Sequence, residues 1–153
     1  MRKLIILPVL MTAMIISSCS SCNNKKEVQE ADPNVIVLFD GQTFEGWRAY
    51  NGTEIPGAWT IEDGAIKING SGRGEAGAEN GGDIIFDRKF SNFELTFEWK
   101  VAQGSNSGVF YLAQEVPGEP IYISAPEYQV LDNANHPDAL LGVDGNRQSA
   151  SLY

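Results

Sequence analysis

Short stretches of alternating apolar and polar residues, separated by turn-forming pairs, run through the chain from residue 35 onward. The clearest covers residues 93–101, where Leu95, Phe97, Trp99 and Val101 fall on one side and polar residues on the other. Strict alternation predicts a strand with one buried and one solvated face, as antiparallel sheets have. We therefore expect Trp99 in the core. Shorter strands are predicted at residues 35–39, 59–62, 65–68, 83–86, 109–114 and 128–131.

Turn signals separate these runs. Asp63 and Gly64 stand between residues 59–62 and 65–68, and both positions of a tight hairpin turn need a positive φ, which predicts a β-hairpin there. Residues 69–82 are polar and rich in glycine, and they predict a loop; no helical pattern follows that would make a phosphate site. Many short strands without any helical period predict an all-β, antiparallel β-sandwich or barrel.

The N-terminus has the features of an exported protein. Arg2 and Lys3 precede an apolar run, residues 4–16, which is too short to span a bilayer and has signal-peptide flanks. The tetrad Ile-Ser-Ser-Cys at residues 16–19 resembles a lipobox, so we expect lipidation at Cys19. The alternatives are Cys22 and an ordinary secretory signal.

The predicted organisation is a signal peptide over residues 1–18, a lipidated flexible tether over 19–34 and a single domain over 35–153. Because both cysteines precede the domain, no disulfide framework is expected within it. Loss of the two basic leader residues lowers the net charge from −9 to −11. Such an acidic protein is a poor nucleic-acid ligand, so a sugar or a metal ion is a better partner.

A series of motifs follows in a fixed order through the predicted domain. Together they resemble the 3-keto-disaccharide hydrolase domain family, which is similar in fold to concanavalin-like jelly rolls. Leu112 stands where that family often has arginine, and the family domain continues beyond the motif that ends at Tyr153, so the resemblance implies a C-terminally truncated copy. The motifs are Leu-Phe-Asp-Gly at 38–41, Gly-Trp at 46–47, Trp-Thr-Ile-Glu-Asp-Gly at 59–64, Phe-Ser-Asn-Phe-Glu-Leu at 90–95, Asn-Ser-Gly-Val-Phe-Tyr at 106–111, Glu-Tyr-Gln-Val-Leu-Asp at 127–132 and Ser-Ala-Ser-Leu-Tyr at 149–153.

The resemblance implies action on glycosides that carry a ketone at C3. The ketone acidifies the C2 proton; a base removes it, the C1 oxygen leaves by elimination, and water addition completes a net hydrolysis. Such a site needs a base and a group that stabilises the enolate. A divalent metal ion would serve as the Lewis acid on the ketone.

Candidate residues for this chemistry gather on the strand predicted at 128–131 and the residue that precedes it. Glu127 and Gln129 lie two apart and share one face, so we expect Glu127 to act as a catalytic residue and Gln129 to bind substrate. Glu98 on a neighbouring strand and Asn106 are further substrate-binding candidates. Each also has an ordinary interpretation, because polar residues on an outer face are usually only solvated, and residues 106–108 can be a simple turn.

The segment after that strand offers further polar groups. Asp132 follows the strand end, and His136, the single histidine, lies four residues beyond it. An Asp/His/Glu set can bind a divalent metal through Asp132 and His136. Alternatively, His136 is the general base, and Asp132 only starts an Asx-turn.

Three interpretations of the whole protein compete. The first is an enzyme anchored by its lipid to the outer membrane, on the periplasmic or cell-surface side, that acts on 3-keto-glycosides. The second is a non-catalytic carbohydrate-binding module, since fold does not fix function; Trp47 and Trp59 could then stack on sugar rings. The third is a structural envelope lipoprotein. The oligomeric state is open.

Overall fold

The computed structural model describes residues 32–70 and 81–153. The chain divides into two compact units; the described residues of the first are 32–37 and 90–97, and those of the second are 38–70, 81–89 and 98–153. The predicted signal peptide, the lipidation site at Cys19 and most of the tether lie outside the described residues. So does most of the glycine-rich loop.

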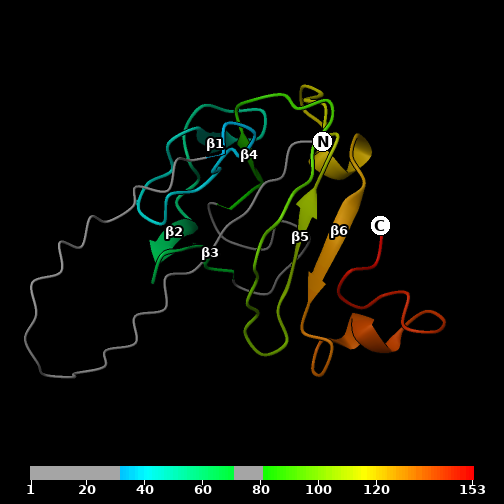
Figure 1. The fold of residues 1–153 in the computed structure, drawn as a ribbon. Helices are drawn as coiled ribbons and strands as arrows, with labels where there is room; N and C mark the ends of the chain where they lie inside the picture. The colour runs from blue at the N-terminus through cyan, green and yellow to red at the C-terminus, as the bar shows by residue number, and fades with distance from the viewer. Residues whose placement is uncertain (1–31, 71–80) are drawn as a thin grey trace, which may run out of the picture. The chain divides into compact units, whose positions relative to one another are not determined.

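The described part of the chain is all-β, with two short 3-10 helices (Figure 1). Every ladder is antiparallel, and the strands pair as β1–β4, β2–β3 and β5–β6. This confirms the predicted fold class, an antiparallel all-β fold. Within residues 32–70 and 81–153, no helix has the length and apolar character needed to cross a membrane. The elements are β1 (Trp47–Ala49), β2 (Trp59–Glu62), β3 (Ala65–Ile68), β4 (Ile84–Phe86), β5 (Asn106–Phe110), η1 (Ile121–Ile123), β6 (Glu127–Leu131) and η2 (Pro137–Leu140).

The predicted hairpin at Asp63 and Gly64 is confirmed. β2 and β3 pair directly, with Glu62 opposite Ala65. Asp63 has a φ of 53° and Gly64 a φ of 74°, so both central turn residues are left-handed, as a type I′ turn requires. The turn is compatible with the right-handed twist of the two strands, which is why the pair Asp-Gly specifies it.

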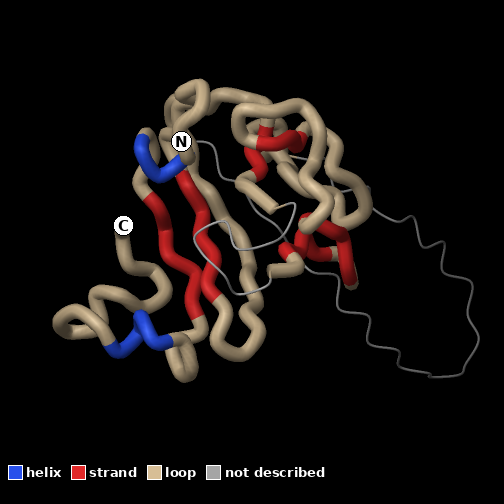
Figure 2. Tube along the Cα trace, turned by 180° about the vertical axis from the view of Figure 1, so that it is seen from behind, coloured by secondary structure: helices blue, strands red, loops and turns tan. Residues whose placement is uncertain are grey.

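β6 is the central strand of the largest ladder (Figure 2, the longer pair of red strands). All five of its residues pair with β5, and its odd-numbered residues also bond to the segment 149–153 on the other side. Glu127 and Tyr153 exchange both backbone hydrogen bonds, at 2.9 and 3.0 Å, and Gln129 N–H donates to the Ser151 carbonyl at 3.0 Å. Residues 149–153, which carry the small-residue motif, therefore complete the pairing of β6.

A serine hydroxyl finishes this ladder. Ser149 Oγ accepts from Leu131 N–H at 2.8 Å and donates to the Leu131 carbonyl at 2.7 Å, so one side chain serves both backbone groups. Next to it, Ala150 has a φ of 73°, and its N–H donates to the Gln129 carbonyl. The left-handed backbone at Ala150 bends the segment, and the Leu131 backbone groups are bonded by the side chain of Ser149 rather than by its backbone.

The core of the larger unit lies along β6. Leu131 is 1% exposed and Val130 is 5% exposed, and both are apolar, so their burial stabilises this ladder. A separate aromatic contact supports β1 and β4, where the rings of Trp47 and Phe86 meet edge to face at 5.6 Å between centroids.

Two predicted strands are wrong. Residues 93–101 form no strand, and only Glu94 makes a single bridge; residues 35–39 are also irregular. The alternation in residues 93–101 is still visible in side-chain burial, because Leu95, Phe97 and Val101 are partly covered. A period of two sets which side chains face inward, but a strand also needs a neighbouring backbone to bond to.

The predicted strand at 109–114 is displaced toward the N-terminus. β5 begins at Asn106 and ends at Phe110, so the predicted turn at 106–108 is wrong: this segment pairs with Gln129, Val130 and Leu131. Leu112, with a φ of 58°, marks the exit from the ladder, since a left-handed residue rotates the backbone out of the pleat.

The smaller unit is held by local contacts. Asp32 Oδ1 accepts from Asn34 N–H at 2.9 Å, which forms an Asx-turn, and the Asp32 carbonyl accepts from Val35 N–H. The rings of Phe90 and Phe93 lie edge to face with centroids 6.2 Å apart.

Candidate functional site

The predicted shared face of Glu127 and Gln129 is present. Both side chains belong to β6, two residues apart, so they project from the same side of the ladder. From β5, Asn106, Gly108 and Phe110 belong to this side, because they pair with Leu131, Gln129 and Glu127. We call these six residues the β5–β6 face.

Gln129 is not the solvated side chain that an outer face would give. It is 3% exposed, and Gln129 Oε1 accepts a hydrogen bond from Val130 N–H at 3.0 Å. That bond fixes the orientation of the amide, because the backbone donor must meet the oxygen. The amide nitrogen is therefore presented as a hydrogen-bond donor, which suits recognition of a carbonyl or hydroxyl oxygen.

Glu127 is partly covered, and its carboxylate lies against Gly108 of the neighbouring strand. A carboxylate beside an amide donor can take a proton from a carbon acid while the amide holds the adjacent oxygen. Asn106, at the start of β5, is exposed on the same face. The structure thus places Glu127, Gln129 and Asn106, three of the predicted site residues, on one face of the ladder.

Asp132 has a structural role in the loop that follows β6. Asp132 Oδ2 accepts from Gly104 N–H at 2.7 Å and from Asn135 Nδ2 at 2.8 Å, and Oδ1 accepts from Ala134 N–H at 3.1 Å. The bond from Gly104 N–H, with that from Asn135, holds the pKa of the Asp132 carboxyl below its usual value. Asp132 is therefore the Asx-turn residue that the sequence allowed.

His136 caps the short helix η2. His136 Nδ1 accepts from Asp138 N–H at 3.2 Å, and the His136 N–H donates to the Asp132 carbonyl at 2.9 Å. Since Nδ1 accepts, the neutral ring carries its proton on Nε2 and can offer only a donor. This arrangement suits His136 less well as a general base than Glu127.

The fit of a metal ion to the described residues is poor. Within residues 32–70 and 81–153, no group of three His, Cys, Asp or Glu side chains is placed to hold a metal ion. Asp132 already accepts three hydrogen bonds, and His136 Nδ1 is engaged. The metal ion therefore remains a prediction, and Asp132 and His136 would need further ligands to bind it.

Glu98 and the tryptophans are not residues of β5 or β6. Glu98 is exposed in an irregular segment rather than on a neighbouring strand. Trp47 Nε1 donates to the Leu38 carbonyl and Trp59 Nε1 to the Gly82 carbonyl, each at 2.7 Å, so both indoles fix local structure. Trp99 is 45% exposed and not in the core, contrary to the prediction.

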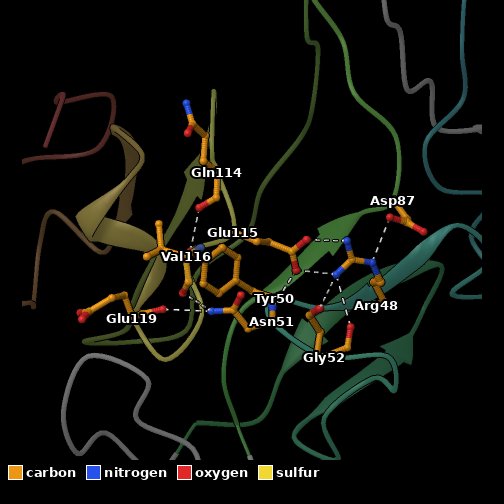
Figure 3. A network of polar contacts seen from close by, with 10 residues as sticks. Arg48, Tyr50, Asn51, Gly52, Asp87, Gln114, Glu115, Val116 and Glu119 are labelled. Carbon is orange, nitrogen blue, oxygen red and sulfur yellow. Dashed lines mark hydrogen bonds and ion pairs between the residues drawn. The ribbon is translucent and has the colours of Figure 1, made fainter.

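A polar network around Arg48 was not predicted (Figure 3). Arg48 makes a bidentate pair with Glu115, at 2.6 and 2.8 Å, and its Nε lies 2.9 Å from Asp87. Asn51 N–H donates to Glu115 Oε1 at 2.8 Å, and the Tyr50 hydroxyl donates to the Gln114 carbonyl at 2.8 Å. The Arg48 network is the set of Arg48, at its centre, with Tyr50, Asn51, Asp87 and Glu115.

The Arg48 network ties the segment after β1 to the loop after β5. The pair with Arg48, and then the Asn51 N–H, lowers the pKa of Glu115 to about 2, and the same pair raises the pKa of Arg48. Asn51 Nδ2 also donates to the Val116 carbonyl at 2.8 Å. Arg48 bonds to two carboxylates, those of Glu115 and Asp87, so the network has the character of a structural clamp.

Comparison with known proteins gives the relationships of the chain. A curated protein of Bacteroides thetaiotaomicron named 3-keto-disaccharide hydrolase is 65% identical over 127 residues, covering 77% of this chain and 44% of that protein. The chain thus spans less than half the length of this relative. A crystal structure from Parabacteroides distasonis, described as a candidate glycosyl hydrolase, matches with a TM-score of 0.55 and 26% identity.

That structural match covers 77% of this chain and 52% of the other, and it agrees with an all-β jelly roll. A family model described as the 3-keto-alpha-glucoside-1,2-lyase-like domain matches residues 34–153, which include the β5–β6 face. Since that match takes in most of the sequence, the chain belongs to the family of 3-keto-alpha-glucoside-1,2-lyase-like domains.

Proposed function

We propose that this chain belongs to an enzyme that cleaves 3-keto-glycosides, with Glu127 as the general base. The observation that carries the proposal is the pairing on β6 of Glu127 with Gln129, whose amide is 3% exposed and oriented as a donor. Polar side chains are rarely buried without a task. The name of the Bacteroides thetaiotaomicron relative supports the same substrate class.

The reaction follows from the acidity that a C3 ketone gives to the C2 proton. The Glu127 carboxylate takes that proton, and the C2–H electron pair forms the enolate. The Gln129 amide N–H donates to the developing oxyanion, which is how a preorganised donor lowers a barrier. As the enolate returns its electrons, the C1–O bond breaks, and the released alkoxide takes a proton. Addition of water to the C1–C2 double bond gives the 3-keto sugar, so the net change is hydrolysis.

The ketone decides which sugars react. Without it the C2 proton is too weakly acidic for a carboxylate to remove. The enzyme should therefore cleave a 3-keto-glucoside and leave the parent glucoside intact, whatever its affinity for each. Comparable cleavage of the parent glucoside would contradict the proposal and indicate a two-carboxylate glycosidase.

The test compares variants of the full-length protein on a 3-keto-glucoside. Glu127→Gln should lower kcat by roughly a hundredfold or more, the usual contribution of a general base. The matched control is Glu119→Gln. Glu119 is exposed, and it contacts the Arg48 network through its backbone carbonyl, which accepts from Asn51 Nδ2, and not through its carboxylate. Substrate deuterated at C2 should react more slowly where proton removal limits the rate.

A carbohydrate-binding module is the second candidate, and the exposure of Trp99 favours it. An indole that is 45% exposed can stack on the face of a sugar ring. This function predicts binding without turnover of either sugar, and loss of binding in Trp99→Ala.

We further propose that the protein is anchored in the cell envelope through lipid on Cys19. The support is the resemblance of residues 16–19 to a lipobox behind a signal-like apolar run. Cys19→Ala should abolish incorporation of a palmitate analogue, whereas Cys22→Ala should not. Label that persists in Cys19→Ala and disappears in Cys22→Ala would move the lipid to Cys22.

A further inference from the structure

The β5–β6 face contains one position without a side chain, at its centre. Gly108 lies opposite Gln129, and the neighbouring pair on the same face is Phe110 with Glu127. Side chains on one face of an antiparallel pair reach both the residue opposite and the diagonal neighbour. A glycine here therefore leaves a gap that both polar residues of β6 can reach.

Glu127 fills that gap. A Cβ atom built on Gly108 would lie 2.6 Å from Glu127 Cγ and would overlap Glu127 Cδ and Oε1. Ordinary contacts between such atoms are about 3.5–4.0 Å. The carboxylate consequently lies across β5 in the space where any other residue would place its side chain.

The backbone does not explain the glycine. Gly108 lies within β5, and its φ is outside the left-handed range that glycine alone tolerates well. Glycine inside a strand weakens it and often marks a close approach by another group. The approaching group here is the flexible end of Glu127, so a larger residue would displace the carboxylate rather than the backbone.

We propose that Gly108 is a positioning residue, which acts through Glu127 by leaving room for its carboxylate beside Gln129. This inference rests on the proposed function for its catalytic consequence. The contact itself does not depend on the substrate. Gly108→Ala keeps every polar group of the face and changes only where the base lies.

The kinetic test uses Gly108→Ala in the full-length protein with a 3-keto-glucoside as substrate. A misplaced catalytic group typically costs roughly 10–100-fold, so kcat should fall by that factor while the melting temperature stays the same or rises, since alanine restricts the unfolded chain. Gly57→Ala is the matched control: its Cβ would meet no atom within 4 Å, and its φ is also outside the left-handed range. An unchanged kcat in Gly108→Ala would overturn the proposal.

A double variant separates positioning from general damage. Glu127→Asp shortens the side chain by one methylene, which draws the carboxylate oxygens back toward β6, away from the point that a Cβ at position 108 would approach most closely. Gly108→Ala should therefore reduce kcat much less in the Glu127→Asp background than in the wild-type background, a coupling that a double-mutant cycle measures. Equal losses in both backgrounds would show that Gly108 acts independently of Glu127.

A spectroscopic test decides the inference even where the proposed function fails. The carboxyl ¹³C resonance of Glu127, assigned by its loss in Glu127→Gln, should shift in Gly108→Ala and stay in place in Gly57→Ala. If the wild-type protein turns over no 3-keto-glucoside, the proposed function is wrong, and this shift alone reports whether Gly108 positions the carboxylate. An unmoved resonance in Gly108→Ala overturns the inference in either case.

Discussion

The β6 ladder and the Arg48 network both belong to the larger unit, but they hold their polar groups in different ways. Along β6 the bonds join backbone to backbone, or backbone to Ser149, and toward Leu131, which is 1% exposed, they are at least partly buried. In the Arg48 network the bonds come from side chains at the surface, where the Glu115 side chain is 36% exposed. Breaking the first leaves buried groups without partners, whereas breaking the second leaves groups that water can reach. Similar numbers of hydrogen bonds should therefore contribute very differently to stability.

The largest effect should come from Ser149→Ala, because it removes both partners of the buried Leu131 backbone groups. We expect the free energy of unfolding to fall by about 2 kcal/mol, the usual cost of an unsatisfied buried group. Urea denaturation measures it. Ser151→Ala is the control, since Ser151 Oγ reaches the Gly145 carbonyl only at 3.5 Å. Equal losses of stability in Ser149→Ala and Ser151→Ala would show that the bonds from Ser149 to Leu131 make no special contribution.

Arg48→Lys should have a smaller effect. Lysine keeps the positive charge and loses the planar fork that contacts Glu115 through two nitrogens. We expect a loss of about 1 kcal/mol in the free energy of unfolding, together with faster amide exchange in the loop that contains Glu115. Asp87→Asn is the milder control, because the Asp87 side chain is 62% exposed and makes one ion pair with Arg48. A larger loss of stability in Arg48→Lys than in Ser149→Ala would show that the Arg48 network contributes more to stability than the bonds from Ser149 to Leu131.

The pH dependence of the free energy of unfolding should reveal the contribution of the Arg48 network separately from that of the β6 ladder. The folded-state pKa of Glu115 is about 2, below its ordinary value of 4.5, so its contribution is present above pH 4.5 and disappears as the pH falls toward 2. After allowance for solvent screening we expect about 1 kcal/mol from this window. Arg48→Met should lose less stability across it than wild type does. A parallel decline in both proteins would show that Glu115 is not stabilised by Arg48.

Burial acts in the other direction at Asp83, where it raises the pKa of the carboxyl above 3.8. Protonation of Asp83 therefore favours the folded state as the pH falls, because the neutral form is the one that burial tolerates. Asp83→Asn removes this opposing contribution. Its stability should consequently decline more steeply with acid than that of wild type, as thermal melts at stepped pH would reveal.

The smallest effect should come from the surface pair in the hairpin. Lys67 Nζ lies 2.6 Å from Glu62 Oε2, with the two side chains 47% and 57% exposed. We expect Lys67→Ala to change the free energy of unfolding less than any other variant named here, and 1 M salt to reduce even that change. A change as large as that of Arg48→Lys would mean that exposure does not set the contribution of these pairs.

The same contrast explains what the sequence could predict. Asp63-Gly64 and the alternation at 127–131 are local signals with a direct physical cause, and both elements are present. The Arg48 network has no such signal, because Arg48 and Glu115 are 67 residues apart and only the fold brings them together. Local pattern therefore predicted the strand that carries Glu127 and gave no indication of the clamp.

The errors have a related cause. Residues 93–101 have a cleaner alternation than β6, yet β6 has a pairing partner on each side. Trp99 was assigned to the core by that alternation alone, and it is exposed. The small residues at 106–108 suggested a turn, although glycine at 108 is explained by the carboxylate that lies over it.

The pairing of β6 also bears on the order in which the chain folds. Among the described ladders, β2 and β3 are joined by a two-residue turn, whereas β6 reaches its partners across residues 111–126 and 132–148. Closing longer loops costs more entropy before any contact forms, so distant pairings form late. In pulse-labelling hydrogen exchange, amides of the hairpin should therefore gain protection before the Gln129 amide. The face that carries Glu127 would then be assembled after the hairpin has formed.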